Sequence, residues 1–386
     1  MSSTTVESSS TSAERVRPLL AAAKSLAPDF EAASRQAELD RRLPSQVADK
    51  MKAAGLFWMK TPLELGGSEL NPLDFADVME EIAYHDASAA WATMIGNGTT
   101  GVMAGWLPDE GVQELFADKS APPVTAGQFT PRGKAVPVDG GYRVTGRWAF
   151  GSGIDHANWV IGAAVVEGGD EIIFVCAPKS EVTVHDNWHV AGLQGTGSHD
   201  YSMEDVFVPE YRTMNAYAGI AKRGGPLFKE GVLIFISNEI SPLVVGVARR
   251  AIDDMIDLAH STTRTVGALV DRPAFHKAVG QAEAKWHAAR ALYREALAEG
   301  FRLAETVGSV DDATASMLWA RHAFVGELCA DLVRELFRYG GGRVLSLEHP
   351  MQRHLRNLLA TLQHIHMTEE KFEFAGLAAI QARSAR

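Results

Sequence analysis

The chain has 386 residues, 46% of them hydrophobic, and its 37 Lys and Arg against 48 Asp and Glu leave a net charge of −11. This acidic balance argues against binding to nucleic acid or to an anionic membrane surface, because both need a basic surface. A chain of this length predicts two or three domains with a sizeable core.

The first residues indicate a tail rather than a targeting segment. Residues 1–12 are rich in Ser and Thr and lack the basic start and apolar stretch of a secretory signal, so we expect a disordered tail. The apolar run Trp159–Val166 is well short of the ~20 residues that span a bilayer, so we expect no membrane segment. Cys176 and Cys329 cannot build a disulfide framework and show no metal-ligand spacing, which fits a reducing cytoplasm.

The first domain, expected over residues 13–120, has a helical pattern. Apolar residues recur at spacings of three and four from Ala13 onward. Pro44 and Pro72 each stand at the start of a further predicted helix, over 46–54 and from 72. A fourth helix is predicted over 87–105, and a short fifth helix begins at Pro108.

The middle domain, expected over residues 121–230, changes to short alternating strands. The segment VDGGYRVTGRWAF places a Gly-Gly turn between two alternating runs, which predicts a hairpin. Further β-branched runs separated by turn residues follow up to Val208. We expect a small β-barrel or sandwich.

The last domain, expected over residues 231–386, reads as an antiparallel four-helix bundle. The predicted helices cover 240–261, 273–307, 310–342 and 349–381. On one continuous helix, His364 and His366 would point about 200° apart and could not share an ion, so no metal site is predicted.

Two segments look like generic catalytic or cofactor-binding motifs, but neither lies in the secondary structure that such a motif needs. The Gly151-Ser152-Gly153 triplet lies in a β region without the strand–elbow–helix setting of a hydrolase nucleophile. The glycines of 192–197 are not followed by a helix, so they do not indicate a dinucleotide fold.

Over residues 15–380 the chain resembles the acyl-CoA dehydrogenase superfamily. Three segments carry the likeness, SPLVVGVARRAIDDMIDLA, GLQGTGSHDYSMEDVFVPEYR and LFRYGGGRVLSLEHPMQRHLRNLLA. The resemblance implies an α+β multidomain fold: an N-terminal helical domain, a middle β-barrel or sandwich and a C-terminal four-helix bundle.

Within the superfamily the details are similar to the oxygenase components of two-component flavin monooxygenases, such as the para-hydroxyphenylacetate, secosteroid-phenol and dibenzothiophene oxygenases. GRWAFGSG resembles their Trp-x-Phe-x-Ser-Gly signature, and ADVMEEIAYHDASAAW resembles their acidic helix with an Asp-x-Ser-x-x-Trp element. The stretch that carries the catalytic glutamate of dehydrogenases reads LQHIHM, and His364 stands where the oxygenases carry a histidine close to the flavin.

The resemblance implies the use of reduced FMN or FAD and O2, through a C4a-hydroperoxyflavin, to hydroxylate or oxygenate a small aromatic or heteroatom-containing molecule. It makes His364 and Ser152 the expected catalytic residues. The expected flavin contacts and substrate contacts are as follows: Trp148, Ser152, Gly153, Gln128, Arg264 and Gly341 for the flavin, and Asn97, Thr100 and Ser198 for the substrate.

The same resemblance implies a homotetramer and a separate NAD(P)H:flavin reductase as partner. Two alternatives stay open. One is an FAD-dependent acyl-CoA dehydrogenase with a displaced base such as Glu239, and the other is a catalytically silent paralogue that binds a ligand. The sequence leaves open whether oxygen goes to carbon, sulfur or nitrogen.

Overall fold

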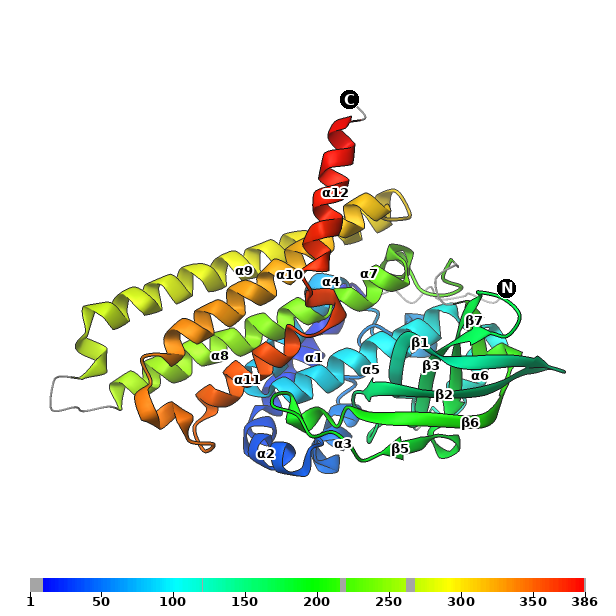
Figure 1. Ribbon diagram of the computed structural model, residues 1–386, viewed down its shortest axis with the longest axis horizontal. Coiled ribbons are helices and arrows are strands. Elements are labelled where there is room, and N and C mark those ends of the chain that lie inside the picture. The colour runs from blue at the N-terminus through cyan, green and yellow to red at the C-terminus, as the bar shows by residue number, and fades with distance from the viewer. Residues whose placement is uncertain (1–9, 120, 216–219, 262–267, 385–386) are drawn as a thin grey trace, which may run out of the picture.

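The computed structural model describes residues 10–119, 121–215, 220–261 and 268–384, which form helices, then a sheet, then helices along the chain (Figure 1). Residues 1–9 of the expected tail lie outside the described residues, and the first helix begins at Ser12, capped by Thr11. The N-terminal helices are α1 (Ser12–Ser25), α2 (Ala27–Asp40), α3 (Ser45–Ala53), α4 (Pro72–His85), α5 (Ala87–Trp106) and α6 (Asp109–Leu115).

Helix α5 forms the centre of the N-terminal part and is buried on every side. All of its residues except Ile95 are buried. It carries glycines where other chains pack against it: a Cβ at Gly101 or Gly105 would lie 2.5 Å from the ring of Phe235 or Phe228, respectively. The segment that leads into the C-terminal helices therefore packs directly on the backbone of α5.

The middle of the chain forms one seven-stranded sheet in the order β5-β6-β2-β1-β3-β4-β7. The predicted hairpin is confirmed, since β1 and β2 pair antiparallel with Val138 opposite Gly141 and Gly140 in the left-handed region at φ +77°. The expected barrel or sandwich is thus a single sheet with β5 and β7 at its edges. The strands are β1 (Thr125–Val138), β2 (Gly141–Gly151), β3 (Trp159–Val166), β4 (Ile172–Pro178), β5 (Thr183–His185), β6 (His199–Pro209) and β7 (Thr213–Asn215).

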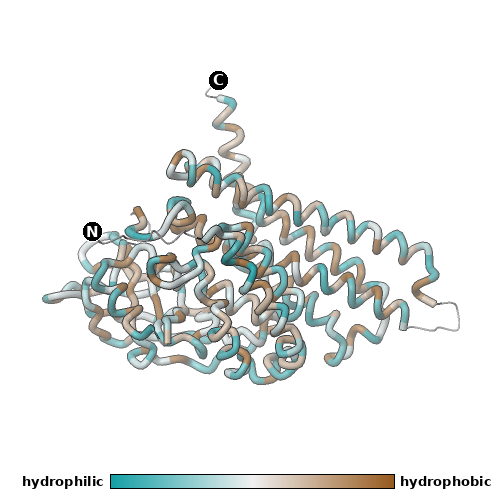
Figure 2. Tube along the Cα trace, turned by 180° about the vertical axis from the view of Figure 1, so that it is seen from behind, coloured by the Kyte–Doolittle hydropathy of each residue, from teal (hydrophilic) through white to brown (hydrophobic). Residues whose placement is uncertain are grey.

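The three long C-terminal helices, α8 (Ile240–His260), α9 (Pro273–Thr306) and α10 (Asp312–Phe337), lie side by side (Figure 1), with polar and apolar residues interspersed along them (Figure 2). The first three predicted helices are present as α8, α9 and α10. The helices are α7 (Val232–Ser237), α8 (Ile240–His260), α9 (Pro273–Thr306), α10 (Asp312–Phe337), α11 (Pro350–Thr361) and α12 (Glu370–Ser384).

The predicted fourth helix over 349–381 is wrong as one continuous element. It ends at Thr361, continues through a short 3-10 turn at Ile365–Met367, and restarts at Glu370 as α12. Helix α12 then projects away from the rest of the molecule (Figure 1). The acidic first turn of α12, Glu370 and Glu373, is the sequence signal of a new helix start.

One described segment, Val232–His260, has the length and hydropathy of a membrane-spanning helix, and 83% of its most apolar window is buried inside the protein. It comprises α7 and α8. The core helix of a globular protein has the same composition when it packs on all sides.

Candidate active site

Ser152 lies in a tight turn at the end of β2. The backbone is left-handed at Phe150, with φ +65°, and again at Gly153, with φ +71°. The amide of Gly153 donates to the carbonyl of Thr196 at 3.0 Å, which ties this turn to the segment before β6. A bulky residue with positive φ is uncommon, so the turn is held by its surroundings rather than by local preference.

A row of hydroxyl groups connects α5 to the segment before β6. It consists of Ser152, Ser198 and Thr196 and is called the hydroxyl chain. The indole Nε1 of Trp91 donates to Ser152 Oγ at 3.0 Å, and Ser152 Oγ lies 2.7 Å from Ser198 Oγ. Ser198 Oγ lies 2.6 Å from Thr196 Oγ1, which donates to the carbonyl of Leu193 at 2.8 Å. Ser198 is therefore a hydrogen-bond partner of Ser152, and its predicted substrate contact stays a prediction.

His364 meets the same tryptophan from the C-terminal helices. The His364 ring lies 5.5 Å from the Trp91 ring, edge-on at 81°, in the break between α11 and α12. The backbone amide of His366 donates to His364 Nδ1 at 3.4 Å, so the neutral ring carries its proton on Nε2. Burial, with a smaller effect of the Lys371 charge, lowers the pKa of His364 to about 4, and the ring is neutral near pH 7. Trp91 thus brings Ser152 and His364 together.

The break also changes the relation between the two histidines. The rings of His364 and His366 lie 5.3 Å apart, whereas a continuous helix would have pointed them apart. His366 is buried, and burial lowers its pKa well below the ordinary value. Among the described residues no group of three or more His, Cys, Asp or Glu side chains is arranged to hold a metal ion.

The exposed aromatic ring of this site belongs to Phe150, which is 59% exposed and lies edge-on to Trp188 with ring centroids 6.1 Å apart. We predicted Trp148 for this role, and the structure corrects that. Trp148 has no exposed surface, donates to the carbonyl of Ala163 at 2.9 Å and stacks on Tyr201 inside the sheet. Phe150 was missed, although it is the phenylalanine of the quoted signature.

Two predicted substrate residues instead join elements of the fold. The side chain of Asn97 donates to the carbonyls of Leu56 and Thr93 and accepts from the amide of Lys60, so its hydrogen bonds are used internally. Thr100 Oγ1 accepts from the amide of Thr125 at 3.0 Å and joins α5 to β1. Both side chains are fully buried, so neither reaches a ligand in this conformation.

Gln128 remains close to the site through its backbone. Its amide donates to the hydroxyl of Tyr201 at 2.8 Å, and its side chain accepts from the amide of Phe129 at 3.0 Å. The pairing of β1 with β3 shifts register between Gln128 and Pro131, which marks an irregularity next to the site. The predicted flavin contact of Gln128 stays a prediction.

Of the remaining two predicted flavin contacts, the structure describes only Gly341, and it does not join this group. Gly341 is exposed, with φ +61°, in the turn that follows α10, on a different connection from the one that holds His364. Arg264 lies outside the described residues.

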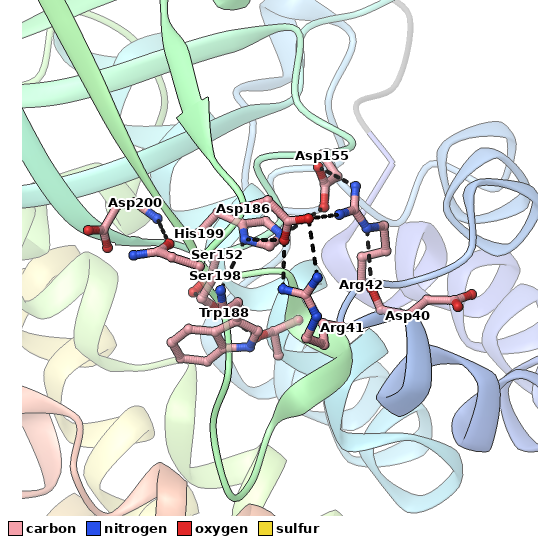
Figure 3. Close-up of polar contacts among 12 residues, drawn as sticks. Asp40, Arg41, Arg42, Ser152, Asp155, Asp186, Trp188, Ser198, His199 and Asp200 are labelled. Atoms are coloured by element: carbon pink, nitrogen blue, oxygen red, sulfur yellow. Dashed lines mark hydrogen bonds and ion pairs between the residues drawn. The ribbon is translucent and has the colours of Figure 1, made fainter.

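Beside the hydroxyl chain, two arginines and two aspartates enclose His199 (Figure 3). His199 lies 3.6 Å from Asp155 and 3.7 Å from Asp186, and these carboxylates pair with Arg42 at 3.3 Å and Arg41 at 2.6 Å. Burial lowers the pKa of His199, and the two carboxylates partly offset this effect. The cluster joins the end of α2 to the start of β6 and fixes the residue that follows Ser198.

Ser152 also borders a narrow gap that is too small to hold a water molecule. Its polar edge includes His156, whose Nε2 is buried without a hydrogen-bond partner among the described residues, and burial lowers the pKa of His156 to about 4. The lining residues are Phe57, Ala92, Gly96, Val124, Thr125, Ser152, Gly153 and His156.

Glu239, the displaced base of the dehydrogenase alternative, is held in an ion pair. Its Oε1 lies 2.8 Å from Lys60 Nζ, and both side chains are buried. Burial raises the pKa of Glu239 to about 7, against the opposing effect of Lys60. A Cβ at Gly98 would lie 2.7 Å from Glu239 Oε2, so this carboxylate packs directly on α5.

Two family models match the chain: the acyl-CoA dehydrogenase N-terminal domain over residues 14–110 and the C-terminal domain over residues 239–369. The chain belongs to the acyl-CoA dehydrogenase superfamily. It is 32% identical over 360 residues to a pigment production hydroxylase of Rhodococcus sp., covering 88% of this chain and 90% of that one. It is 29% identical over 378 residues to an indole-3-acetate monooxygenase of Pseudomonas putida, covering 94% and 95%.

Among solved structures, this superfamily member resembles XiaF from Streptomyces sp. in complex with FADH2 and glycerol. The TM-score is 0.90 at 23% identity, and the match covers 96% of each chain. By name, the two sequence relatives are a monooxygenase and a hydroxylase. The FADH(2)-dependent resorcinol hydroxylase, oxygenase component, of Rhizobium sp. is 28% identical to this chain over 360 residues, covering 88% of each.

The residues around Ser152 fit a reduced flavin. An exposed aromatic ring at Phe150 offers a stacking surface, Ser152 Oγ keeps an open lone pair, and neutral His364 offers one N–H. These are the aromatic and hydrogen-bonding groups that a flat, polar-edged ring needs.

Proposed function

We propose that this chain is the oxygenase component of a two-component flavin-dependent monooxygenase. It would receive reduced FMN or FAD from a separate NAD(P)H:flavin reductase and place one oxygen atom of O2 into a small aromatic or heteroatom-containing substrate. The convergence of Ser152 and His364 on Trp91 supports this proposal most directly, since it brings together the two side chains that the resemblance makes catalytic.

The bound reduced flavin supplies the electrons and the carbon centre that reacts with O2. The protein supplies position, protons and shielding. Ser152 accepts a hydrogen bond through its open lone pair, and Phe150 presents its ring to the flavin. His364, neutral and with its proton on Nε2, donates a hydrogen bond at the reacting edge. The buried indole of Trp91 keeps water away from both polar side chains.

The neutral state of His364 refines its role. A ring with a pKa of about 4 is a weak base near pH 7, and its Nδ1 is already engaged by the His366 amide. We therefore propose that His364 acts as a hydrogen-bond donor and not as a base toward a phenolic substrate.

We propose that the chain works as a homotetramer in the cytoplasm. Helix α12 supports self-association, because it projects from the molecule and carries exposed Phe374, Leu377 and Ile380 (Figure 1). Replacing Leu377 with Glu, followed by light scattering across a dilution series, tests this. The wild-type mass should be four times the chain mass, and the variant should be smaller.

The proposed activity is tested without knowing the substrate. The protein is mixed anaerobically with reduced FMN, and separately with reduced FAD, and oxygenated buffer is then added in a rapid-scan spectrophotometer. We expect the return of oxidised flavin to be delayed relative to free flavin, with the longer delay for the preferred flavin. Reoxidation at the free-flavin rate in both cases would contradict the proposal.

The dehydrogenase alternative is tested in parallel with oxidised FAD and acyl-CoA thioesters. Bleaching of the FAD absorbance would support it. We expect none, because Glu239 is paired with Lys60 and packed against Gly98.

A further inference from the structure

The direction of every hydrogen bond in the hydroxyl chain follows from its two ends. At one end, the indole N–H of Trp91 can only donate, so Ser152 Oγ accepts at 3.0 Å. At the other end, the carbonyl of Leu193 can only accept, so the proton of Thr196 is used in the 2.8 Å bond to it.

The two inner contacts are then fixed as well. A hydroxyl has one proton, and the proton of Thr196 is already used. The 2.6 Å contact between Ser198 and Thr196 must therefore use the proton of Ser198, and the 2.7 Å contact between Ser152 and Ser198 must use the proton of Ser152. Ser152 is left with an open lone pair and no free proton.

Reversal of this chain is disfavoured by burial. Ser152, Ser198 and Thr196 are 5%, 3% and 2% exposed, so bulk water does not replace a lost partner. Reversal would also set the lone pairs of Thr196 Oγ1 and the Leu193 carbonyl against each other at 2.8 Å. The Leu193 carbonyl is itself held in place, since it accepts from Trp188 Nε1 at 3.1 Å and the Leu193 amide donates to Asn357 at 2.7 Å.

We propose that Thr196 and Ser198 are positioning residues that keep Ser152 a pure hydrogen-bond acceptor, and that this polarity makes the site select reduced flavin over oxidised flavin. The inference rests on the proposed function and takes N5 as the flavin atom that faces Ser152. Reduced flavin carries a proton on N5 and can donate to Ser152. Oxidised flavin has only a lone pair there, which would oppose the lone pair of Ser152. The chain thereby favours uptake of the reduced cofactor and release of the oxidised one.

The experiment measures dissociation constants of reduced and oxidised flavin, under anaerobic conditions for the former, and takes their ratio for each variant. Thr196→Val keeps the shape of the side chain but removes its oxygen, so the Ser198 proton turns to Ser152 and the Ser152 proton becomes free. We expect the preference for reduced flavin to fall by about tenfold or more. The reason is that Ser152, with its proton free, could donate a buried hydrogen bond to N5 of oxidised flavin instead of only accepting one from reduced flavin. Ser198→Ala should shift the ratio in the same direction, because it removes the acceptor of the Ser152 proton.

Two controls separate polarity from packing. Thr196→Ser retains the hydroxyl and should retain the wild-type ratio. Thr93→Val removes an equally buried hydroxyl on α5, which donates to the Ala89 carbonyl at 2.9 Å outside the chain, and should also retain it. Thermal melting of each variant shows that it is folded.

The outcomes are distinct. A wild-type ratio in both folded variants, Thr196→Val and Ser198→Ala, would overturn the inference while leaving the proposed function intact. An equal shift in Thr93→Val would overturn it too, because the effect would then be general. If the wild-type protein binds neither reduced FMN nor reduced FAD, the proposed function fails and the inference fails with it.

Discussion

Replacing Lys60 with Met should destabilise the protein in alkaline buffer and much less in acid. Lys60 Nζ lies 2.8 Å from Glu239, and both groups are buried. Burial raises the pKa of Glu239 from 4.5 in the unfolded chain to about 7 in the folded protein. Such a group costs stability as the pH rises above 4.5, and the cost levels off above pH 7.

The magnitude follows from 1.36 kcal/mol per pKa unit. At pH 8.5 the wild-type protein loses about 3 kcal/mol to this group. Without Lys60, Glu239 stays protonated in the folded state at that pH, and the loss becomes about 5 kcal/mol. The difference is about 2 kcal/mol at pH 8.5. At pH 5.5 it is close to zero, because Glu239 is protonated in both folded proteins. Glu230, whose pKa is raised to about 8 by burial against an opposing effect of Lys60, adds to the same trend.

The assay is urea unfolding of both proteins at pH 5.5 and pH 8.5. Lys50→Met is the matched control, because Lys50 also pairs with a carboxylate, Asp29, at 2.6 Å but on the surface. It should change the free energy of unfolding by less than about 1 kcal/mol at either pH. An equal loss for Lys60→Met at the two pH values would refute the reasoning that Glu239 ionises across this range.

Three further predictions concern the site. Asn97→Ala should lower the free energy of unfolding by about 3 kcal/mol in urea titrations, because three buried hydrogen bonds are lost. The flavin dissociation constant should stay unchanged. Weaker flavin binding with unchanged stability would indicate that Asn97 is a ligand contact. His364→Gln should speed the reoxidation of bound reduced flavin and raise the hydrogen peroxide released, with binding little changed; rapid-scan traces identical to wild type would remove it from the site. Phe150→Gly should weaken flavin binding by about tenfold, because the aromatic ring is lost. The free energy of unfolding should stay equal or rise by about 1 kcal/mol, because glycine adopts the positive φ without strain. Unchanged flavin affinity in titrations would show that the ring does not face the cofactor.

The order of helices, sheet and helices was predictable because it rests on local signals. Pro72 after Asn71 marks the start of α4, and the glycines at 140 and 141 mark the turn between β1 and β2. These are backbone requirements of single positions, so they do not depend on distant parts of the chain.

The aromatic residue of the site was not predictable in the same way. In a regular strand, Trp148 and Phe150 would lie on one face. The pairing of β2 with β6 shifts register between Trp148 and Gly151, and Phe150 adopts φ +65°, so one ring is buried and the other exposed. Such an irregularity arises from tertiary contacts and leaves no periodic signal in the sequence.

The internal hydrogen bonds of Asn97 and Thr100 on α5 were not predictable from the sequence for a related reason. Asn97 and Thr100 have the chemistry of ligand contacts, but their partners are backbone groups of Lys60, Leu56 and Thr125, which the sequence does not place near them. The resemblance to a known family predicted Ser152 and His364, and the structure brings both of them to Trp91. Trp91, which connects them, was quoted in that resemblance without a role.

The projecting helix α12 has a practical consequence for handling the protein. Helix α12 begins at Glu370, six residues after His364, and its far end is the last described part of the chain. An affinity tag fused to the C-terminus would follow this helix in the chain, within about ten residues of the exposed apolar side chains Leu377 and Ile380. A tag at the N-terminus would precede α1 in the chain and would leave helix α12 and the turn at His364 unaltered.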